Sequence, residues 1–197
     1  MGKIILASAS PRRRDLLKQL NYNFEIVPSP YVEDHTRTDF SYDFIETLAT
    51  NKVLAVVPLI KEPCIIIGAD TVVVLDNEIL GKPQDRQNAF DMLKSLSNKK
   101  HSVVTSVVVL NTKTNILLKK SVTSEVTFNL LTDEMIDYYV DNYKPMDKAG
   151  AYGIQEMPEG YIKSYTGSLE NIIGLDTKTV EELVNKCKNE NNSHFTK

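Results

Sequence analysis

The sequence predicts an α/β domain built on a mixed β-sheet, and two features of its 197 residues lead to this fold class. Early in the chain, short apolar runs of strand length alternate with segments whose apolar residues recur at helical spacing. In the middle of the chain, two long strand-like segments at residues 101–110 and 116–130 flank a polar turn at 111–115 and predict an extended hairpin. The sheet is therefore expected to hold both parallel and antiparallel neighbours.

Strands are expected wherever an apolar run rich in β-branched residues is bounded by turn residues. They fall at residues 3–6, 24–27, 64–67, 72–75, 78–80, 101–110 and 116–130. Gly68-Ala69-Asp70-Thr71 separates the third and fourth runs, and Asp76-Asn77 is typical of a tight turn before the fifth.

Helices are expected where apolar residues recur three and four apart behind a capping residue. They fall at residues 11–20, 41–57, 86–96, 132–142 and 179–188. Ser10 caps the first, with Pro11 in its first turn, and Thr132 caps the fourth. Before the last helix, the glycine-punctuated residues 148–174 are expected to form tight turns between short strands. Residues 1–188 are thus expected to form a single domain with two lobes around a cleft, followed by a polar tail at 189–197.

Composition restricts the functional classes. Hydrophobic residues make up 42% of the chain and charged residues 25%, which is ordinary for a soluble globular protein. A net charge of −3 disfavours a dedicated nucleic-acid-binding protein, so any positive site must be local. We expect no signal peptide and no membrane span, since no apolar run is long enough. The cysteines, Cys64 and Cys187, belong to no metal-ligand cluster, which favours a reduced, cytoplasmic setting.

Arg12, Arg13 and Arg14 stand together in the first turn of the first expected helix. Cations there cost roughly 0.3–1 kcal/mol each, because the helix dipole is positive at its N-terminus. An anionic ligand would reverse this cost, since N-terminal amides and planar guanidinium groups together bind phosphate oxygens. The run predicts a phosphate site; the alternative is three solvated arginines, one of them partly neutralised by Asp15.

Asp70 follows the apolar run 64–67 and is expected at the carboxyl edge of a strand, where ligands of open α/β sheets bind. A carboxylate there can hold Mg²⁺ or act as a general base; the alternative is an aspartate that caps a turn. Lys82, which Pro83 restricts to extended geometry, can return to the same edge and meet a phosphate, although surface Gly-Lys-Pro turns are common.

Other candidates lie elsewhere in the chain. Glu33 and Asp34 are acids in a proline-bounded loop and can supply metal ligands, or simply be solvated. Lys52 lies beside the apolar stripe of its helix, where it either faces a site or extends to solvent. Gln155 ends the stretch DKAGAYGIQ, whose glycines let the backbone approach a ligand and whose amide suits a base edge; the alternative is a set of tight turns.

Four motifs, in this order, resemble the Maf family of nucleoside triphosphate pyrophosphatases: SASPRRRDLL, GADTVVVLDNEILGKP, DKAGAYGIQ and GSLENIIGL. The resemblance spans nearly the whole chain. It implies an inosine-triphosphatase-like fold, a long bent mixed sheet with helices around a central cleft, and a homodimer is expected because the family is often dimeric. It also implies metal-dependent hydrolysis of a nucleoside triphosphate between the α and β phosphates, which releases a nucleoside monophosphate and pyrophosphate.

The resemblance also implies roles for single residues. Asp70 matches the catalytic acidic residue, the proton acceptor for the attacking water. Phosphate-binding, cleft or specificity roles are implied for Ser8, Ser10, Arg12, Arg13, Lys52, Lys82, Thr71 and Gln155. Glu33 and Asp70 would hold the divalent cation, Mg²⁺ or Mn²⁺. GADT together with YGIQ resembles the branch that acts on dTTP and UTP, with a house-cleaning role that limits misincorporation.

Two positions depart from the family pattern. Glu170 stands where an aromatic residue is more common, and Asp176 replaces a proline and offers an N-cap for the last helix. Two alternatives stay open: a modified or purine triphosphate as substrate, and a nucleotide-sensing regulator linked to cell division or septum control.

Overall fold

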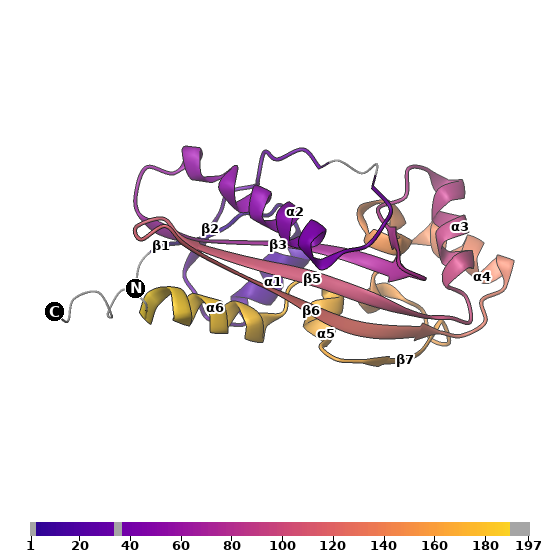
Figure 1. Cartoon of the computed structure of the whole chain (residues 1–197). Helices are drawn as coiled ribbons and strands as arrows, with labels where there is room; N and C mark the ends of the chain where they lie inside the picture. Colours follow the sequence, from indigo (N-terminus) through magenta and orange to yellow (C-terminus); the bar gives the residue numbers. More distant parts are fainter. Residues whose placement is uncertain (1–2, 34–36, 190–197) are drawn as a thin grey trace.

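The computed structural model describes residues 3–33 and 37–189, which fold around a mixed seven-stranded sheet of order β2-β1-β3-β5-β6-β7, with β4 paired to β3 (Figure 1). The strands are β1 (Lys3–Leu6), β2 (Phe24–Ile26), β3 (Cys64–Leu75), β4 (Glu78–Leu80), β5 (Lys100–Asn111), β6 (Ile116–Phe128) and β7 (Ile162–Thr166). β1 runs parallel to β2 and β3, and every other pairing is antiparallel. The predicted α/β class, with a mixed sheet and a long central hairpin, is confirmed.

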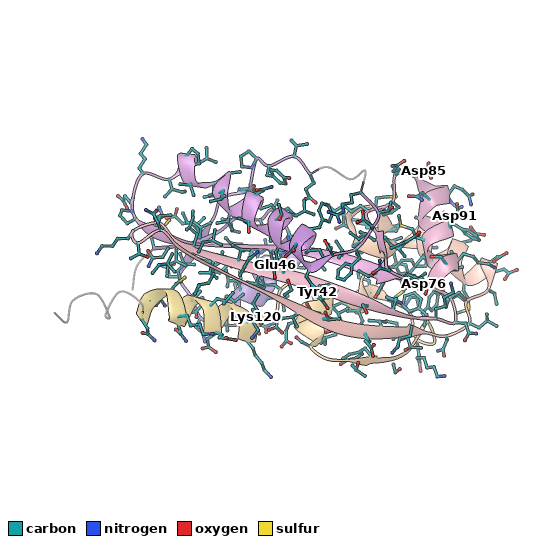
Figure 2. All side chains as sticks on the ribbon, in the orientation of Figure 1. Tyr42, Glu46, Asp76, Asp85, Asp91 and Lys120 are labelled. Carbon is teal, nitrogen blue, oxygen red and sulfur yellow. The ribbon has the colours of Figure 1, made fainter. Side chains whose placement is uncertain are left out.

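Helices cover both faces of this sheet (Figure 1). They are α1 (Pro11–Lys18), α2 (Tyr42–Leu54), α3 (Arg86–Leu96), α4 (Asp133–Asn142), α5 (Leu169–Ile173) and α6 (Thr177–Asn189). Short 3₁₀ turns are η1 (Val57–Leu59), η2 (Pro145–Asp147), η3 (Ala149–Ala151) and η4 (Ile154–Glu156). α2 lies on one face and α1 and α6 on the other, while α3 and α4 close the far end. Charged side chains such as Asp85 and Asp91 extend outward at that end (Figure 2).

Side-chain alternation along the strands supplies a separate apolar layer to each face. Ile66 and Val108 pack with Val53 beneath α2. Ile67 and Val109 point the other way, toward α1 and α6. The layer at the far end lies under α3 and α4 and includes the largest buried side chains, Phe128 and Tyr139.

The prediction of two strands at residues 64–67 and 72–75 is wrong, because β3 is one strand of 12 residues. It pairs with β5 without interruption from Ile65 to Val74. Gly68 is needed for helix packing rather than for a turn: a Cβ there would lie 2.5 Å from Cγ2 of Val53 on α2. Asp70 is therefore in the middle of a strand, and its expected place at a strand's carboxyl edge is corrected.

One edge of β3 is shared by two short strands that do not meet. β1 pairs with it over Cys64–Ile67 and β4 over Val73–Leu75, so residues 68–72 have no neighbouring strand on that side. The gap begins at the carboxyl end of β1, because β1 stops at Leu6 while β3 continues past it. This gap in the sheet edge is where Asp70 lies.

The other differences are local. Residues 148–174 contain the strand β7 and the helix α5 besides tight turns. The helix expected over 41–57 ends at Leu54 and continues as a 3₁₀ turn. Asp176 caps α6 as predicted, accepting from the Thr179 backbone N–H at 2.8 Å. Among the described residues, no helix has both the length and the apolarity to cross a membrane. Residues 190–197 of the expected tail lie outside the described residues.

Candidate active site

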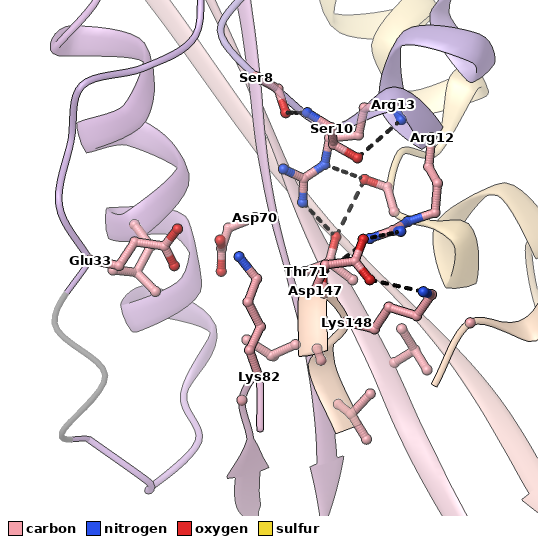
Figure 3. A pocket seen from close by; sticks show the side chains of 18 of the residues that line it. Ser8, Ser10, Arg12, Arg13, Glu33, Asp70, Thr71, Lys82, Asp147 and Lys148 are labelled. Carbon is pink, nitrogen blue, oxygen red and sulfur yellow. Dashed lines mark hydrogen bonds and ion pairs between the residues drawn. The ribbon is translucent and has the colours of Figure 1, made fainter. Parts of the chain in front are cut away.

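A cavity of about 870 Å³ opens at the gap in the edge of β3. Its walls come from the β1–α1 loop, α2, β3, the segment after β4, and the turns η2 to η4. Every site residue predicted from the sequence lines it: Ser8, Ser10, Arg12, Arg13, Glu33, Lys52, Asp70, Thr71, Lys82 and Gln155. Asp34, the second acid of the predicted pair, lies outside the described residues. Figure 3 shows most of this set converging from separate elements.

The three consecutive arginines separate on folding. Successive residues of a helix are about 100° apart around its axis, so the three side chains cannot share one face. Arg12 and Arg13 enter the cavity (Figure 3), whereas Arg14 pairs with Asp15 at 2.9 Å outside it. The interpretation as solvated arginines holds only for Arg14. The β1–α1 loop is fixed by its serines: the Ser10 N–H donates to Oγ of Ser8 at 3.2 Å, and Ser10 caps α1.

Arg13 is held against the sheet by two of its donors. Its Nε donates to the Gly174 carbonyl at 2.9 Å and its Nη2 to Oγ1 of Thr71 at 3.0 Å. Burial lowers the pKa of the Arg13 guanidinium, while the carboxylates of Asp70 and Glu33 act in the opposite direction. An arginine stays charged under these conditions, so a fixed positive group faces the cavity.

Arg12 is held by residue 147, which carried no role in the sequence-based predictions. Nη1 of Arg12 donates to Oδ2 of Asp147 at 2.9 Å, and Nη2 to its carbonyl at 3.3 Å. Lys148, almost fully buried, donates to the other Asp147 oxygen at 2.8 Å and pairs with Glu156 at 3.1 Å. Burial raises the pKa of Asp147, but the hydrogen bonds from Lys148 and Arg12 outweigh it and keep that pKa below its usual value.

Opposite the arginines, Lys52 of α2 lies between two carboxylates. Its ammonium pairs with Glu33 at 2.8 Å and also with Asp70. These side chains are largely buried, with exposed fractions of 11% for Lys52 and 5% for Asp70. Lys52 therefore faces the site, and the alternative in which it extends to solvent is wrong.

Asp70 and Thr71 are neighbours in β3, so their side chains project to opposite faces of the sheet. Asp70 meets Lys52 on the α2 side, and Thr71 meets Arg13 on the α1 side. Both residues line the cavity because the strand edge there has no neighbour. Lys82 extends its amine toward Asp70 from below (Figure 3). Exposed Gln155 lines the same cavity.

The stretch 147–155 brings its residues to the cavity through an unusual backbone path. Gly150 and Ala151 have positive φ angles of 64° and 63°. A Cβ on Gly150 would lie 2.9 Å from Val73, so glycine is required for both conformation and space. This reversal sends Tyr152 back into the wall of the cavity, where its hydroxyl pairs with buried His101 at 2.7 Å.

The residues that sequence reasoning missed mostly position others. Asp147 and Lys148 are adjacent charged residues at the start of the motif DKAGAYGIQ, yet nothing in the sequence pairs them with Arg12. Gly174 contributes a backbone carbonyl, which no side-chain pattern reveals. His101 received no role, and it has one only as the buried partner of Tyr152.

The fold and the site together define an α/β protein with a cation-lined cleft of small-molecule size at its sheet edge. Residues 3–187 match the family described as Maf-like protein. A dTTP/UTP pyrophosphatase of Clostridium botulinum (strain Eklund 17B / Type B) is 40% identical over 186 residues, which cover 94% of this chain and 99% of that protein. The chain belongs to the Maf family.

A second relative is similar to the chain in sequence, and a solved structure is similar to it only weakly. A dTTP/UTP pyrophosphatase of Clostridium novyi (strain NT) is 43% identical over 176 residues, covering 88% of this chain and 91% of that protein. Among solved structures, a nucleoside-triphosphatase / dITP/XTP pyrophosphatase from Mycobacterium abscessus is 15% identical with a TM-score of 0.47, covering 94% of each chain. That weak structural likeness adds nothing to the sequence matches.

Proposed function

We propose that this chain hydrolyses dTTP and UTP between the α and β phosphates, releasing a nucleoside monophosphate and pyrophosphate. One observation carries the proposal: Arg12, Arg13 and Lys82 face the same cavity as a buried carboxylate, Asp70. A triphosphate supplies the negative charge that this cationic wall lacks, and the cavity has the size usual for small-molecule sites. The names of the relatives at about 40% identity support the substrate class.

The carboxylates fit a divalent cation of the Mg²⁺ or Mn²⁺ type. Glu33 and Asp70 come from different elements and converge on one point, which the Lys52 ammonium fills. Mg²⁺ is usually bound through one or two carboxylates, with water and substrate phosphates completing its coordination. Among the described residues there is no cluster of three acidic, cysteine or histidine ligands, so the substrate phosphates would have to contribute. When bound, such a cation neutralises charge on the leaving pyrophosphate.

The chain's own residues divide the work between two walls. On the α1 side, Arg12, Arg13 and the N-terminal amides of the helix bind phosphate oxygens. On the α2 side, Asp70 accepts the proton of a water whose oxygen bonds to the α phosphorus, while the bond from that phosphorus to the bridging oxygen breaks. Lys52 must release the Asp70 carboxylate for this, and its ammonium is then free to bind a phosphate.

Base recognition is assigned to the turns after η2. Gln155 offers an amide donor and acceptor, and the backbone around Gly153 approaches the cavity without a side chain. Pyrimidines, including modified ones, are the bases proposed, which would make the activity a house-cleaning one that limits misincorporation. A homodimer and a cytoplasmic setting stay predictions.

Pyrophosphate release from a panel of nucleoside triphosphates, with Mg²⁺ or Mn²⁺, tests this function. We expect release from dTTP and UTP by the wild type, and none by Asp70→Asn, with folding checked by circular dichroism. Asp76→Asn is the matched control, because Asp76 lies exposed just beyond the end of β3 (Figure 2), outside the cavity. Nucleotide binding without release under any metal would refute the enzyme and favour the regulator.

A further inference from the structure

A chain of buried hydrogen bonds runs behind the cleft from α5 to Arg13, and its central member is Thr105 of β5. Thr105 is fully buried and lies opposite Thr71 in the β3–β5 pairing. It does not line the cavity. Its hydroxyl contacts the Asn171 carbonyl at 2.9 Å and Oγ1 of Thr71 at 2.9 Å.

The direction of these bonds follows from counting protons. A threonine hydroxyl carries a single proton, and a carbonyl oxygen only accepts. Thr105 therefore donates to the Asn171 carbonyl and has only lone pairs left for Thr71. Thr71 must then donate its own proton to Thr105. The Gly174 carbonyl, 3.3 Å from Oγ1 of Thr71, is thereby left to accept from Arg13.

This polarity determines what Thr71 offers to Arg13. With its proton directed at Thr105, Oγ1 of Thr71 presents a lone pair to Nη2 of Arg13 at 3.0 Å. The Gly174 carbonyl accepts from Nε of Arg13 at 2.9 Å. Two neighbouring donors of the guanidinium are thus fixed on the protein side. Nη1 has no hydrogen-bond partner among residues 3–33 and 37–189, and it faces the side of the cleft where Asp70 lies (Figure 3).

The far end of the chain is anchored firmly. Asn171 is fully buried, and its Nδ2 donates to the Val103 carbonyl at 3.0 Å and to Oγ of Ser124 at 2.9 Å. Its backbone N–H donates to Oγ of Ser168, which caps α5. The acceptor that orients Thr105 therefore cannot shift without breaking the start of α5.

We propose that Thr105 is a positioning residue for phosphate binding: through Thr71 it holds the guanidinium of Arg13 so that Nη1 meets a phosphate oxygen. That the phosphate belongs to a nucleoside triphosphate rests on the proposed function. Without the Thr105 hydroxyl, the Thr71 proton turns to the Gly174 carbonyl and competes there with Arg13. One anchor of the guanidinium is weakened, although no residue that touches the ligand has been changed.

The test measures binding of inorganic tripolyphosphate by calorimetry, which requires no hydrolysis. Thr105→Val is expected to weaken binding about three- to tenfold, the range of one net hydrogen bond. Thr105→Ser keeps the hydroxyl and is expected to bind like the wild type. Ser106→Ala is the matched control, because Ser106 is the next residue of β5 and its equally buried hydroxyl has no partner in the described part of the chain.

A double-mutant cycle separates positioning from a general structural effect. If Thr105 acts through Thr71, then Thr105→Val causes no further loss in a Thr71→Val background. Wild-type affinity in Thr105→Val, a loss that adds fully to that of Thr71→Val, or a wild type that does not bind tripolyphosphate would each overturn the proposal. A wild type that binds tripolyphosphate but hydrolyses no nucleotide would refute the proposed function alone.

Discussion

Replacing Lys52 with methionine tests the electrostatics of the α2 side of the site. The ammonium is held between Glu33 and Asp70, and all three side chains are mostly buried. Both carboxylates lie within hydrogen-bond reach of one nitrogen, so their nearest oxygens are separated by roughly 4.5–5 Å. At an effective dielectric constant of about 20, two negative charges at that separation repel by about 3.5 kcal/mol. Removal of one member of a buried ion pair typically costs a similar amount.

We therefore expect Lys52→Met to lose about 3 kcal/mol of unfolding free energy in EDTA at pH 8. A divalent cation should restore most of it, since a ligand at 100 times its Kd contributes about 2.7 kcal/mol. The assay is urea unfolding followed by circular dichroism, with and without Mn²⁺. In the wild type the same Mn²⁺ is expected to stabilise less, because the ammonium competes for the carboxylates.

Two controls make the result specific. Lys82 lines the same cavity, but it is exposed and forms no ion pair within the described residues. The unfolding free energy of Lys82→Met should therefore differ from that of the wild type by no more than about 0.5 kcal/mol. Glu33→Gln combined with Lys52→Met removes the repulsion and should recover stability without metal. A Lys52→Met protein as stable as the wild type in EDTA, or stabilised by Mn²⁺ no more than the wild type, would refute the reasoning.

The remaining predictions use other features of the site. Burial lowers the pKa of His101 to about 4, so the unfolded chain binds a proton at a higher pH than the folded chain does. The free energy of unfolding should therefore fall by about 3 kcal/mol between pH 6.5 and 4. Urea titrations of His101→Gln should lack this drop. Gly150→Ala should cost about 1–3 kcal/mol in thermal unfolding, because φ is positive and space is lacking, whereas Gly81→Ala, with nothing within 4 Å, should cost little. Arg12→Gln should weaken tripolyphosphate binding at least about tenfold, as expected for the loss of a charged hydrogen bond. Arg14 pairs with Asp15 outside the cavity, so Arg14→Gln should bind tripolyphosphate as the wild type does. Equal losses in the two variants would contradict the separation of the arginines.

Much of the fold could be predicted because local patterns and tertiary structure agree. Capping residues gave the helix starts at Ser10 and Thr132, and two long strand-like segments on either side of a polar turn gave the β5–β6 hairpin. The prediction of a break between residues 64–67 and 72–75 failed because the residue type at position 68 is determined by packing against a residue of another element. Gly68 looks like a turn residue, yet its lack of a side chain accommodates Val53 of α2. Sequence spacing does not contain that contact.

The same distinction applies to the site. Charged residues in unfavourable places, such as Arg12 and Arg13 at a helix N-terminus, indicate a ligand from the sequence alone. The groups that position these residues leave no such pattern. A carbonyl such as that of Gly174 carries no sequence signal, and Thr105 is an ordinary β-branched residue within a strand. Their roles depend on register and proton count, which appear only once β3 and β5 are paired.

The site exists because of how β3 is paired rather than because of any single motif. The Ala7 N–H donates to the Ile67 carbonyl as the last contact of β1, and β4 joins the same edge only at Val73. Backbone groups on one edge of a strand recur every second residue, so those of Ala69 and Thr71 face the gap. Side chains alternate in the same register, which directs Asp70 to the carboxylate–ammonium wall and Thr71 to the arginine wall. A gap of five residues in one sheet edge thus gives a single strand access to both walls, and filling it with a longer β1 would remove the cleft without changing any of its charged residues.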